Sequence, residues 1–117
     1  MDSILTSVKK LSGITEEYQH FDADIIMHIN ATFLTLLQLG VGPAEGFAIE
    51  DETSVWTDFI PASPLLNAVK TYMYYKVRLI FDPPSSSGAV EALKQAIAEA
   101  EWRINVEAEK EENQNGV

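Results

Sequence analysis

The chain has 117 residues and a mass of 13.0 kDa, which is enough for one small domain burying about two-thirds of the surface that its unfolded form exposes. Its content of 46% hydrophobic and 22% charged residues predicts a folded globular protein rather than a disordered chain. The absence of cysteine excludes disulfides, Cys-ligated zinc, iron-sulfur clusters and thiol nucleophiles, and a net charge of -10 argues against general nucleic-acid binding because such a surface repels phosphate.

The first predicted helix covers residues 2–12. Asp2 suits its N-cap, and Gly13 suits the left-handed position after its last turn. Apolar side chains recur there at helical spacing, namely Ile4, Leu5, Val8 and Leu11. This segment is therefore expected to pack on one side.

A second helix is predicted over residues 22–39. Asp22 suits its N-cap and Gly40 follows its end. One wide apolar stripe consists of Ile25, Ile26, Ile29, Phe33, Leu36 and Leu37. The opposite face, with Asp24 and His28, is expected to face solvent.

Two histidines and two aspartates fall within nine residues at the start of this helix: His20, Asp22, Asp24 and His28. A metal site needs three or four converging ligands, and His20 and Asp22 precede the helix and are expected to point elsewhere. The pattern fits better with Asp22 as a cap, Asp24 favouring the positive end of the helix and His28 on the surface. No metal site is predicted.

Residues 40–63 break the helical pattern with three glycines, two prolines and the acidic run 50–52. The stretch 40–46 is rich in glycine, but it follows a helix and lacks the Lys-Ser/Thr pair of a phosphate-binding loop. Its apolar residues are too many for a free linker: Phe47, Ile49, Val55, Trp56, Phe59 and Ile60. We expect an extended piece over 47–49, a helical turn over 54–59 and anchorage at both ends.

The third predicted helix covers residues 64–81, with Ser63 as N-cap and Pro64 as its first residue. Its apolar residues form two stripes, one of Leu66, Val69, Met73, Val77 and Ile80 and another of Ala68, Tyr72, Tyr75 and Leu79. It is therefore expected to be the central helix, packed from two sides.

A fourth helix is predicted over residues 88–109, capped by a preceding serine or by Gly88. Its main stripe contains Val90, Leu93, Ile97, Ala100 and Ile104. Trp102 and Val106 lie on the opposite side. Either the long loop folds over Trp102 or this residue contacts another chain, since tryptophan is enriched at interface hot spots.

These elements predict an all-α fold, a small four-helix bundle with a long irregular loop between its second and third helices. Residues 1–112 are expected to form a single domain and residues 113–117 a short flexible tail. The predicted core contains Ile29, Phe33, Leu36, Val69, Met73, Val77, Leu93 and Ile97.

Charge is distributed unevenly along the chain. Residues 1–60 carry ten acids and two lysines, a balance of -8, whereas residues 64–81 hold Lys70, Lys76 and Arg78 and no acid. The basic helix is thus expected to pair with the acidic part of its own chain or of a neighbour. No nucleophile-base pair or Gly-rich cofactor loop is evident, so neither an enzyme nor a bound cofactor is predicted.

Three stretches carry a resemblance that covers about residues 1–108: the run 21–30 (FDADIIMHIN), the loop beginning 39–43 (LGVGP) with Phe47 and Trp56 after it, and the stretch 69–84 (VKTYMYYKVRLIFDPP). The chain resembles the small head-tail connector proteins of tailed bacteriophages and prophages, also called head-completion or adaptor proteins. This resemblance implies a structural subunit of the virion, assembled in the bacterial host cytoplasm, and no diagnostic active-site residues.

The resemblance further implies a ring, dodecameric in the virion, that docks beneath the portal protein and extends the DNA channel toward a tail-side connector or stopper protein. No specific nucleic-acid binding and no membrane association are expected. The expected interface residues are Phe47, Trp56, Phe59, Tyr75, Lys76, Arg78, Trp102 and Val106. The competing hypothesis is a small acidic regulatory or antitoxin-like module that sequesters a basic partner.

Overall fold

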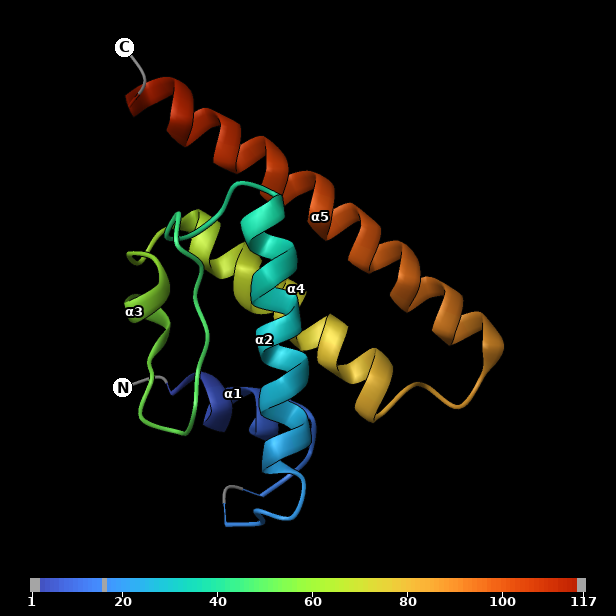
Figure 1. Ribbon diagram of the computed structural model, residues 1–117. Helices are drawn as coiled ribbons and strands as arrows, with labels where there is room; N and C mark the ends of the chain where they lie inside the picture. The colour runs from blue at the N-terminus through green and yellow to red at the C-terminus, as the bar shows by residue number, and fades with distance from the viewer. Residues whose placement is uncertain (1–2, 16, 116–117) are drawn as a thin grey trace.

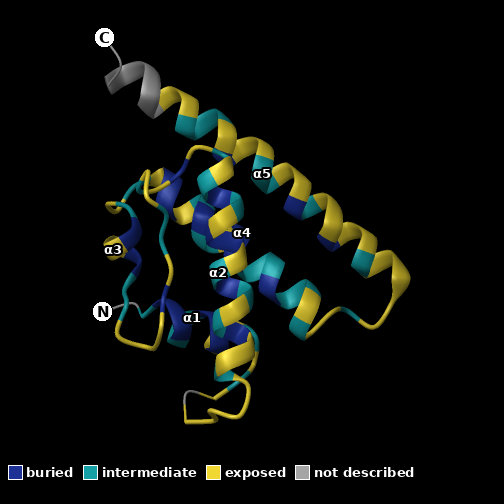
Figure 2. Ribbon diagram, in the orientation of Figure 1, coloured by how far each residue is buried: buried dark blue, intermediate teal, exposed yellow. Residues whose placement is uncertain are grey.

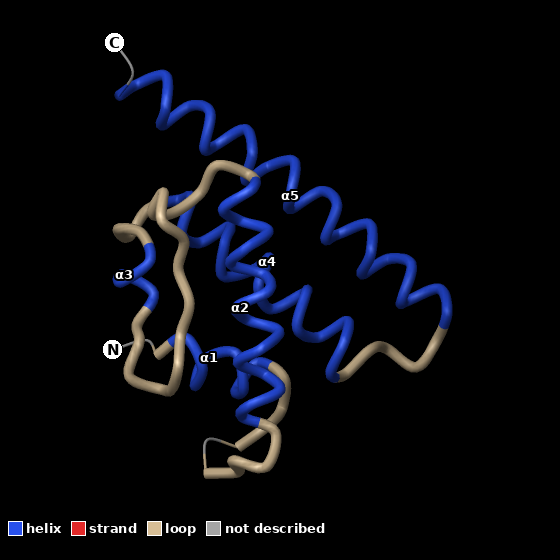
Figure 3. Tube along the Cα trace, in the orientation of Figure 1, coloured by secondary structure: helices blue, strands red, loops and turns tan. Residues whose placement is uncertain are grey.

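Figure 1 shows the computed structural model of the chain, which describes residues 3–15 and 17–115. Its helices are α1 (Ile4–Leu11), α2 (Asp22–Gln38), α3 (Trp56–Phe59), α4 (Pro64–Phe81) and α5 (Ser87–Asn115). The described residues contain no strand, as Figure 3 shows, and only an isolated bridge joins Ser3 to Val55. The all-α prediction is confirmed, with five helices instead of four because the helical turn expected over 54–59 forms α3.

The helix α4 is the central element. It contacts α1, α2 and α5, and its most extensive contact is with α5, which runs back along it in the opposite direction while α2 crosses the pair (Figure 1). The Ser63 Oγ accepts a 3.1 Å hydrogen bond from the Leu66 amide, and Pro64 is the first helical residue. Both the predicted start of this helix and its packing from two sides are confirmed.

The core lies where α1, α2, α4 and the loop before α3 meet, and one face of α5 closes it (Figure 2). All eight predicted core residues are buried: Ile29, Phe33, Leu36, Val69, Met73, Val77, Leu93 and Ile97. Tyr72 and Ile104 are also fully buried. The apolar periodicity of the sequence therefore identified most of the packed face of each long helix, although Ile80 of the predicted stripe on α4 is 55% exposed.

Two predicted helix caps are wrong. Ser3 caps α1, since its Oγ accepts a 3.2 Å hydrogen bond from the Thr6 amide, and Asp2 lies outside the described residues. Asp22 is the first residue of α2, whose N-cap is Phe21 with no side-chain hydrogen bond. The carboxylate of Asp22 forms an ion pair instead of capping the helix.

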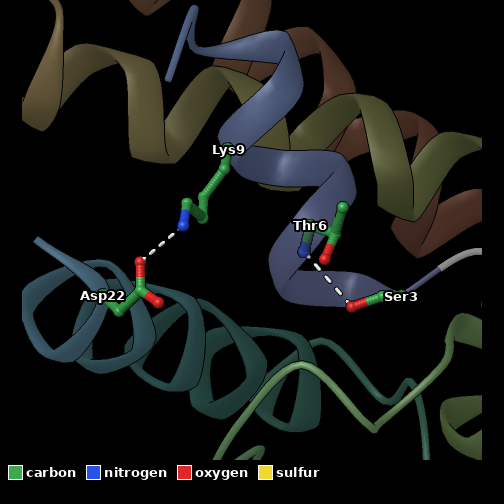
Figure 4. A network of polar contacts seen from close by, with 4 residues as sticks. All are labelled: Ser3, Thr6, Lys9 and Asp22. Atoms are coloured by element: carbon green, nitrogen blue, oxygen red, sulfur yellow. Dashed lines mark hydrogen bonds and ion pairs between the residues drawn. The ribbon is translucent and has the colours of Figure 1, made fainter. Parts of the chain in front are cut away.

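That carboxylate forms an ion pair with Lys9, which ties α1 to the start of α2. Lys9 Nζ lies 2.8 Å from Asp22 Oδ1, and the lysine is only 2% exposed (Figure 4). Burying an ammonium is costly unless an opposite charge compensates it. The pair therefore fixes how α1 meets α2, while the Ser3 and Thr6 contact in the same view closes the first turn of α1.

The segment 40–63 folds back over α2 and is held at several points. Asn30 of α2 donates to the Ile49 carbonyl at 3.0 Å and accepts from the Ile49 amide at 2.8 Å. Trp56 Nε1 donates to Ser7 Oγ at 2.9 Å, and the Ile4 amide donates to the Ser54 carbonyl at 3.0 Å. The predicted anchorage is confirmed, although residues 47–49 form no strand.

The helix α5 is longer than predicted. It begins at Ser87, after a turn in which Ser86 Oγ accepts from the Ala89 amide at 3.2 Å, and it ends at Asn115 instead of residue 109. Residues 113–115 of the expected tail thus belong to α5, and residues 116–117 lie outside the described part; the flexibility of this tail stays a prediction. Within residues 3–15 and 17–115, no helix combines the length and apolarity that a bilayer crossing requires.

The molecule is flat, with principal extents of 47 × 35 × 21 Å. Its accessible surface is 7174 Å². A compact monomer of this mass exposes about 6,300 Å² by the usual scaling. The chain alone thus exposes an excess of roughly 800 Å², about one partner's share of a standard protein interface.

Candidate interaction surfaces

The three aromatic residues predicted as contacts on the loop turn toward the chain's own core. Trp56 and Phe59 are buried and Phe47 is half-buried. The Phe33 ring lies 5.0 Å from Phe47 and 4.7 Å from Phe59, between ring centroids. In this conformation the cluster holds the loop on α2, and its role between subunits stays a prediction.

The three predicted contact residues of α4 are half-buried: Tyr75, Lys76 and Arg78. Lys76 Nζ lies 5.9 Å from the centroid of the Tyr72 ring, and Arg78 makes no ion pair with any described residue. Tyr75 lines a groove of about 210 Å³ between α4 and α5, floored by Ala96 and Ala100. Lys76 and Arg78 do not line this groove, and because they are two residues apart they lie about 200° apart around the helix axis, on different sides of α4.

Trp102 is the most exposed large apolar residue of the described chain. Its exposed fraction is 67%, and it projects from the face of α5 that does not contact α4. Val106, one turn further along, is half-buried. The alternative in which the loop covers Trp102 is wrong for the single chain, because the loop packs on α2 instead.

The structure reveals one apolar surface that the sequence analysis missed. Tyr18, Phe21 and Phe81 surround a hollow of about 430 Å³ between the α1–α2 connection and the end of α4. Ring centroids lie 5.8 Å apart for Tyr18 and Phe21 and 5.6 Å apart for Phe21 and Phe81. The sequence features that could have indicated this hollow are the three aromatic residues of the short connection before α2 and the aromatic residue at the end of α4. Only the fold brings these two segments together.

The four residues considered as metal ligands do not form such a site. No group of three or more His, Cys, Asp or Glu side chains with metal-binding geometry occurs within residues 3–15 and 17–115. Asp22 pairs with Lys9, and the His28 ring, half-buried and 5.9 Å from Phe81, is not the fully exposed group expected from its helix face. These imidazoles belong to the aromatic surface.

A polar contact joins the two longest helices. Tyr72 Oη donates a 2.7 Å hydrogen bond to Glu101 Oε2, and burial raises the pKa of this phenol above its ordinary value, with the Glu101 contact adding to the effect. The resulting neutral phenol joins α4 to α5. Three hollows on the described surface are lined mainly by apolar and small polar side chains, and another, beside the Lys9 and Asp22 pair, is lined mainly by charged and polar ones.

The comparisons with known proteins agree with this description. A family model described as phage connector protein matches residues 4–111, which includes all five helices except the last turn of α5. Comparison with curated proteins and with solved structures gave no match. Because this match covers nearly the whole chain, the chain belongs to the phage connector protein family.

Proposed function

We propose that this chain is one subunit of a connector ring, of twelve copies in the virion, that docks beneath the portal and extends the DNA channel toward the tail. Membership of the phage connector family supports a structural role at the junction of head and tail and contact with other phage proteins there. A non-enzymatic role fits the same membership. Family membership alone does not show that the chain forms a ring or docks onto the portal.

The observation that carries the proposal is the exposure of Trp102 on the outer face of α5. A tryptophan that is 67% exposed leaves most of its apolar surface in water, which is unfavourable unless another molecule covers it. The excess surface of the flat chain, roughly 800 Å², is the size that one partner contributes to a standard interface. Both features are consistent with a subunit rather than an isolated monomer.

Charge separation supports head-to-tail contacts. The helix α4 carries Lys76 and Arg78, whereas residues 1–60 carry a balance of -8. A ring needs heterologous contacts, in which one patch of each subunit meets a different patch of the next. Opposite charges on the two patches favour this pairing and fix its register.

Electron microscopy of the purified chain mixed with its portal protein tests the proposal. Rings coaxial with the portal are expected, with the tail-side protein binding only after the chain has bound. A chain that forms no ring alone and attaches to no portal would contradict the proposal. Tight binding instead to a small basic toxin or regulator would favour the antitoxin-like alternative.

A further inference from the structure

The aromatic hollow at the end of α4 has a composition suited to a ligand. Its walls are the side chains of Tyr18, Phe21 and Phe81, with Ile14 between them, and the first two rings are 48% and 38% exposed. Three aromatic rings that share one concave surface of about 430 Å³ form a shaped apolar site. No described segment of the chain fills it.

The electrostatics of this hollow favour a positive charge. Its lining residues include the Asp82 carboxylate and no lysine or arginine. Both α1 and α4 end there, at Leu11 and Phe81, and the carboxyl end of a helix carries partial negative charge. The last turns of these helices carry Lys9, Lys10 and Arg78, but none of these three residues lines the hollow. The faces of the aromatic rings are also electron-rich and attract cations.

Asp82 is itself in an unfavourable place. It is the C-cap residue of α4, where the helix dipole disfavours an anion, and it makes no ion pair with any described residue. Arg78, one turn earlier, does not pair with it. A cation bound in the hollow would compensate this carboxylate.

We propose that this hollow binds an arginine side chain presented by another protein of the head-tail assembly. A guanidinium is planar, so it can stack on the rings of Tyr18 or Phe81 while two of its N–H groups donate to the Asp82 carboxylate. An ammonium provides no such fork, and a purely apolar side chain would leave Asp82 unpaired. The identity of the partner rests on the proposed function, whereas the arginine site does not.

The source of the arginine is a partner protein rather than a second copy, because most of the chain's own cations contact acids or aromatic rings and Arg78 is assigned to the head-to-tail contact of the proposed ring. Lys9 pairs with Asp22, and three more cations pair with acids of α5: Lys94, Arg103 and Lys110. Lys70 and Lys76 lie about 6 Å from aromatic rings, at 6.0 Å and 5.9 Å respectively. With eight cations against eighteen acids, the chain has few to offer a neighbour and attracts basic partners.

The test uses NMR of the full chain with ¹³C-labelled aromatic rings and two peptides. One is acetyl-Ala-Leu-Arg-Leu-Ala-amide and the other replaces arginine by citrulline, which keeps the shape and removes the charge. The arginine peptide is expected to shift the ring signals of Tyr18, Phe21 and Phe81, with millimolar affinity and roughly tenfold tighter binding than the citrulline peptide. Equal binding of the two peptides would overturn the proposal, and so would unchanged ring signals at about 10 mM peptide.

Two variants locate the site. Asp82→Asn keeps the shape of an exposed residue and is expected to weaken arginine-peptide binding roughly fivefold or more. The matched control, Glu45→Gln, removes one negative charge from the exposed loop and is expected to change binding less than twofold, about the effect of net charge alone. Equal weakening by the two variants would mean general attraction to an acidic surface and would overturn the proposal.

Dilution of the chain alone separates a second copy from a partner. Concentration-dependent shifts of the Tyr18 and Phe81 signals without peptide would show self-docking and contradict a partner protein as the source. This experiment is independent of ring formation. If the arginine peptide does not bind, the portal-docking test of the proposed function is unaffected. If no rings form, the result of the peptide experiment still stands.

Discussion

The phenol of Tyr72 on α4 donates a 2.7 Å hydrogen bond to the carboxylate of Glu101 on α5, and this contact joins the two longest helices. Tyr72 is fully buried, so its hydroxyl has no water to replace the carboxylate. Burial raises the pKa of the phenol above its ordinary value of 10.0, and the hydrogen bond and charge of Glu101 raise it further. The folded chain therefore holds this proton more tightly than the unfolded chain does.

The first prediction concerns alkaline stability. A raised pKa in the folded state gives stability that is complete below about pH 10 and falls as the pH rises above the unfolded value, since the unfolded chain then releases the proton first. Urea unfolding at pH 8 to 11 is expected to show a steeper loss for the wild type than for Tyr72→Phe. Tyr74→Phe serves as the control and should follow the wild-type profile. Parallel profiles for the wild type and Tyr72→Phe would contradict this prediction.

The second prediction concerns Phe33, whose ring holds the loop aromatics on α2. Truncation to alanine removes a buried side chain that contacts Phe47, Trp56 and Phe59, and should cost about 3 to 5 kcal/mol of unfolding free energy. Chemical denaturation measures this cost. A loss well under 1 kcal/mol would remove Phe33 from the core and with it the register of α2.

The third prediction compares two glycines. Gly42 has a φ of +96°, and an added Cβ would overlap the buried Phe59 ring; Gly40 has a φ of +87° and open space around it. Gly40→Ala should cost about 1 kcal/mol for the left-handed backbone alone. Gly42→Ala should cost about 1 to 3 kcal/mol more because the ring must move. Equal losses of thermal stability in the two variants would show that the loop adjusts without strain.

The fourth prediction concerns Trp102. Because this side chain is mainly exposed, Trp102→Ala should leave helix content and thermal stability nearly unchanged. It should weaken ring formation or portal attachment by about 2 kcal/mol or more, the scale of an interface hot spot. Circular dichroism and sedimentation measure the two effects. A mutant that melts at a markedly lower temperature but forms normal rings would assign Trp102 to the stability of the chain itself.

The fifth prediction is that the free chain does not bind duplex DNA. With a net charge of -10, its surface repels phosphate, and the same repulsion would ease the passage of DNA through a channel lined by these carboxylates. Fluorescence anisotropy with a labelled duplex at physiological salt is expected to show no binding. Submicromolar affinity that weakens steeply as salt is added would contradict the prediction.

The long helices could be predicted from the sequence because apolar residues repeat along them, as Ile29, Phe33 and Leu36 do on α2. The helix N-caps were harder to predict from the sequence. Ser3 and Asp2 are both good N-cap residues, and only tertiary contacts select between them. Asp22 was misassigned for the same kind of reason: Lys9, thirteen residues earlier, attracts its carboxylate. The spacing of apolar residues indicates which face of a single helix is packed. It does not indicate which charged side chains of different helices form ion pairs.

The candidate surfaces also depend on contacts between residues that are distant in sequence. The position of Trp102 opposite the main stripe of α5 left two alternatives open, cover by the long loop or contact with another chain. Only the structure, in which Trp102 is exposed, excludes the first for the single chain. The inward orientation of Trp56 and Phe59 depends on Ser7 and Phe33, which are distant in sequence. The hollow at Tyr18 and Phe81 likewise joins two residues that are 63 positions apart in the chain, which a single-sequence pattern does not relate.

The two hydrogen bonds between Asn30 and Ile49 have a consequence for how copies of the chain can lie together. An extended segment whose amide and carbonyl are free is an edge to which another chain can add a strand, and such edges promote aggregation. Here the amide of one side chain provides the donor and the acceptor that a neighbouring strand would offer. Ile49 is thereby closed to strand addition, so many copies can be crowded at one site without joining through the backbone of this segment.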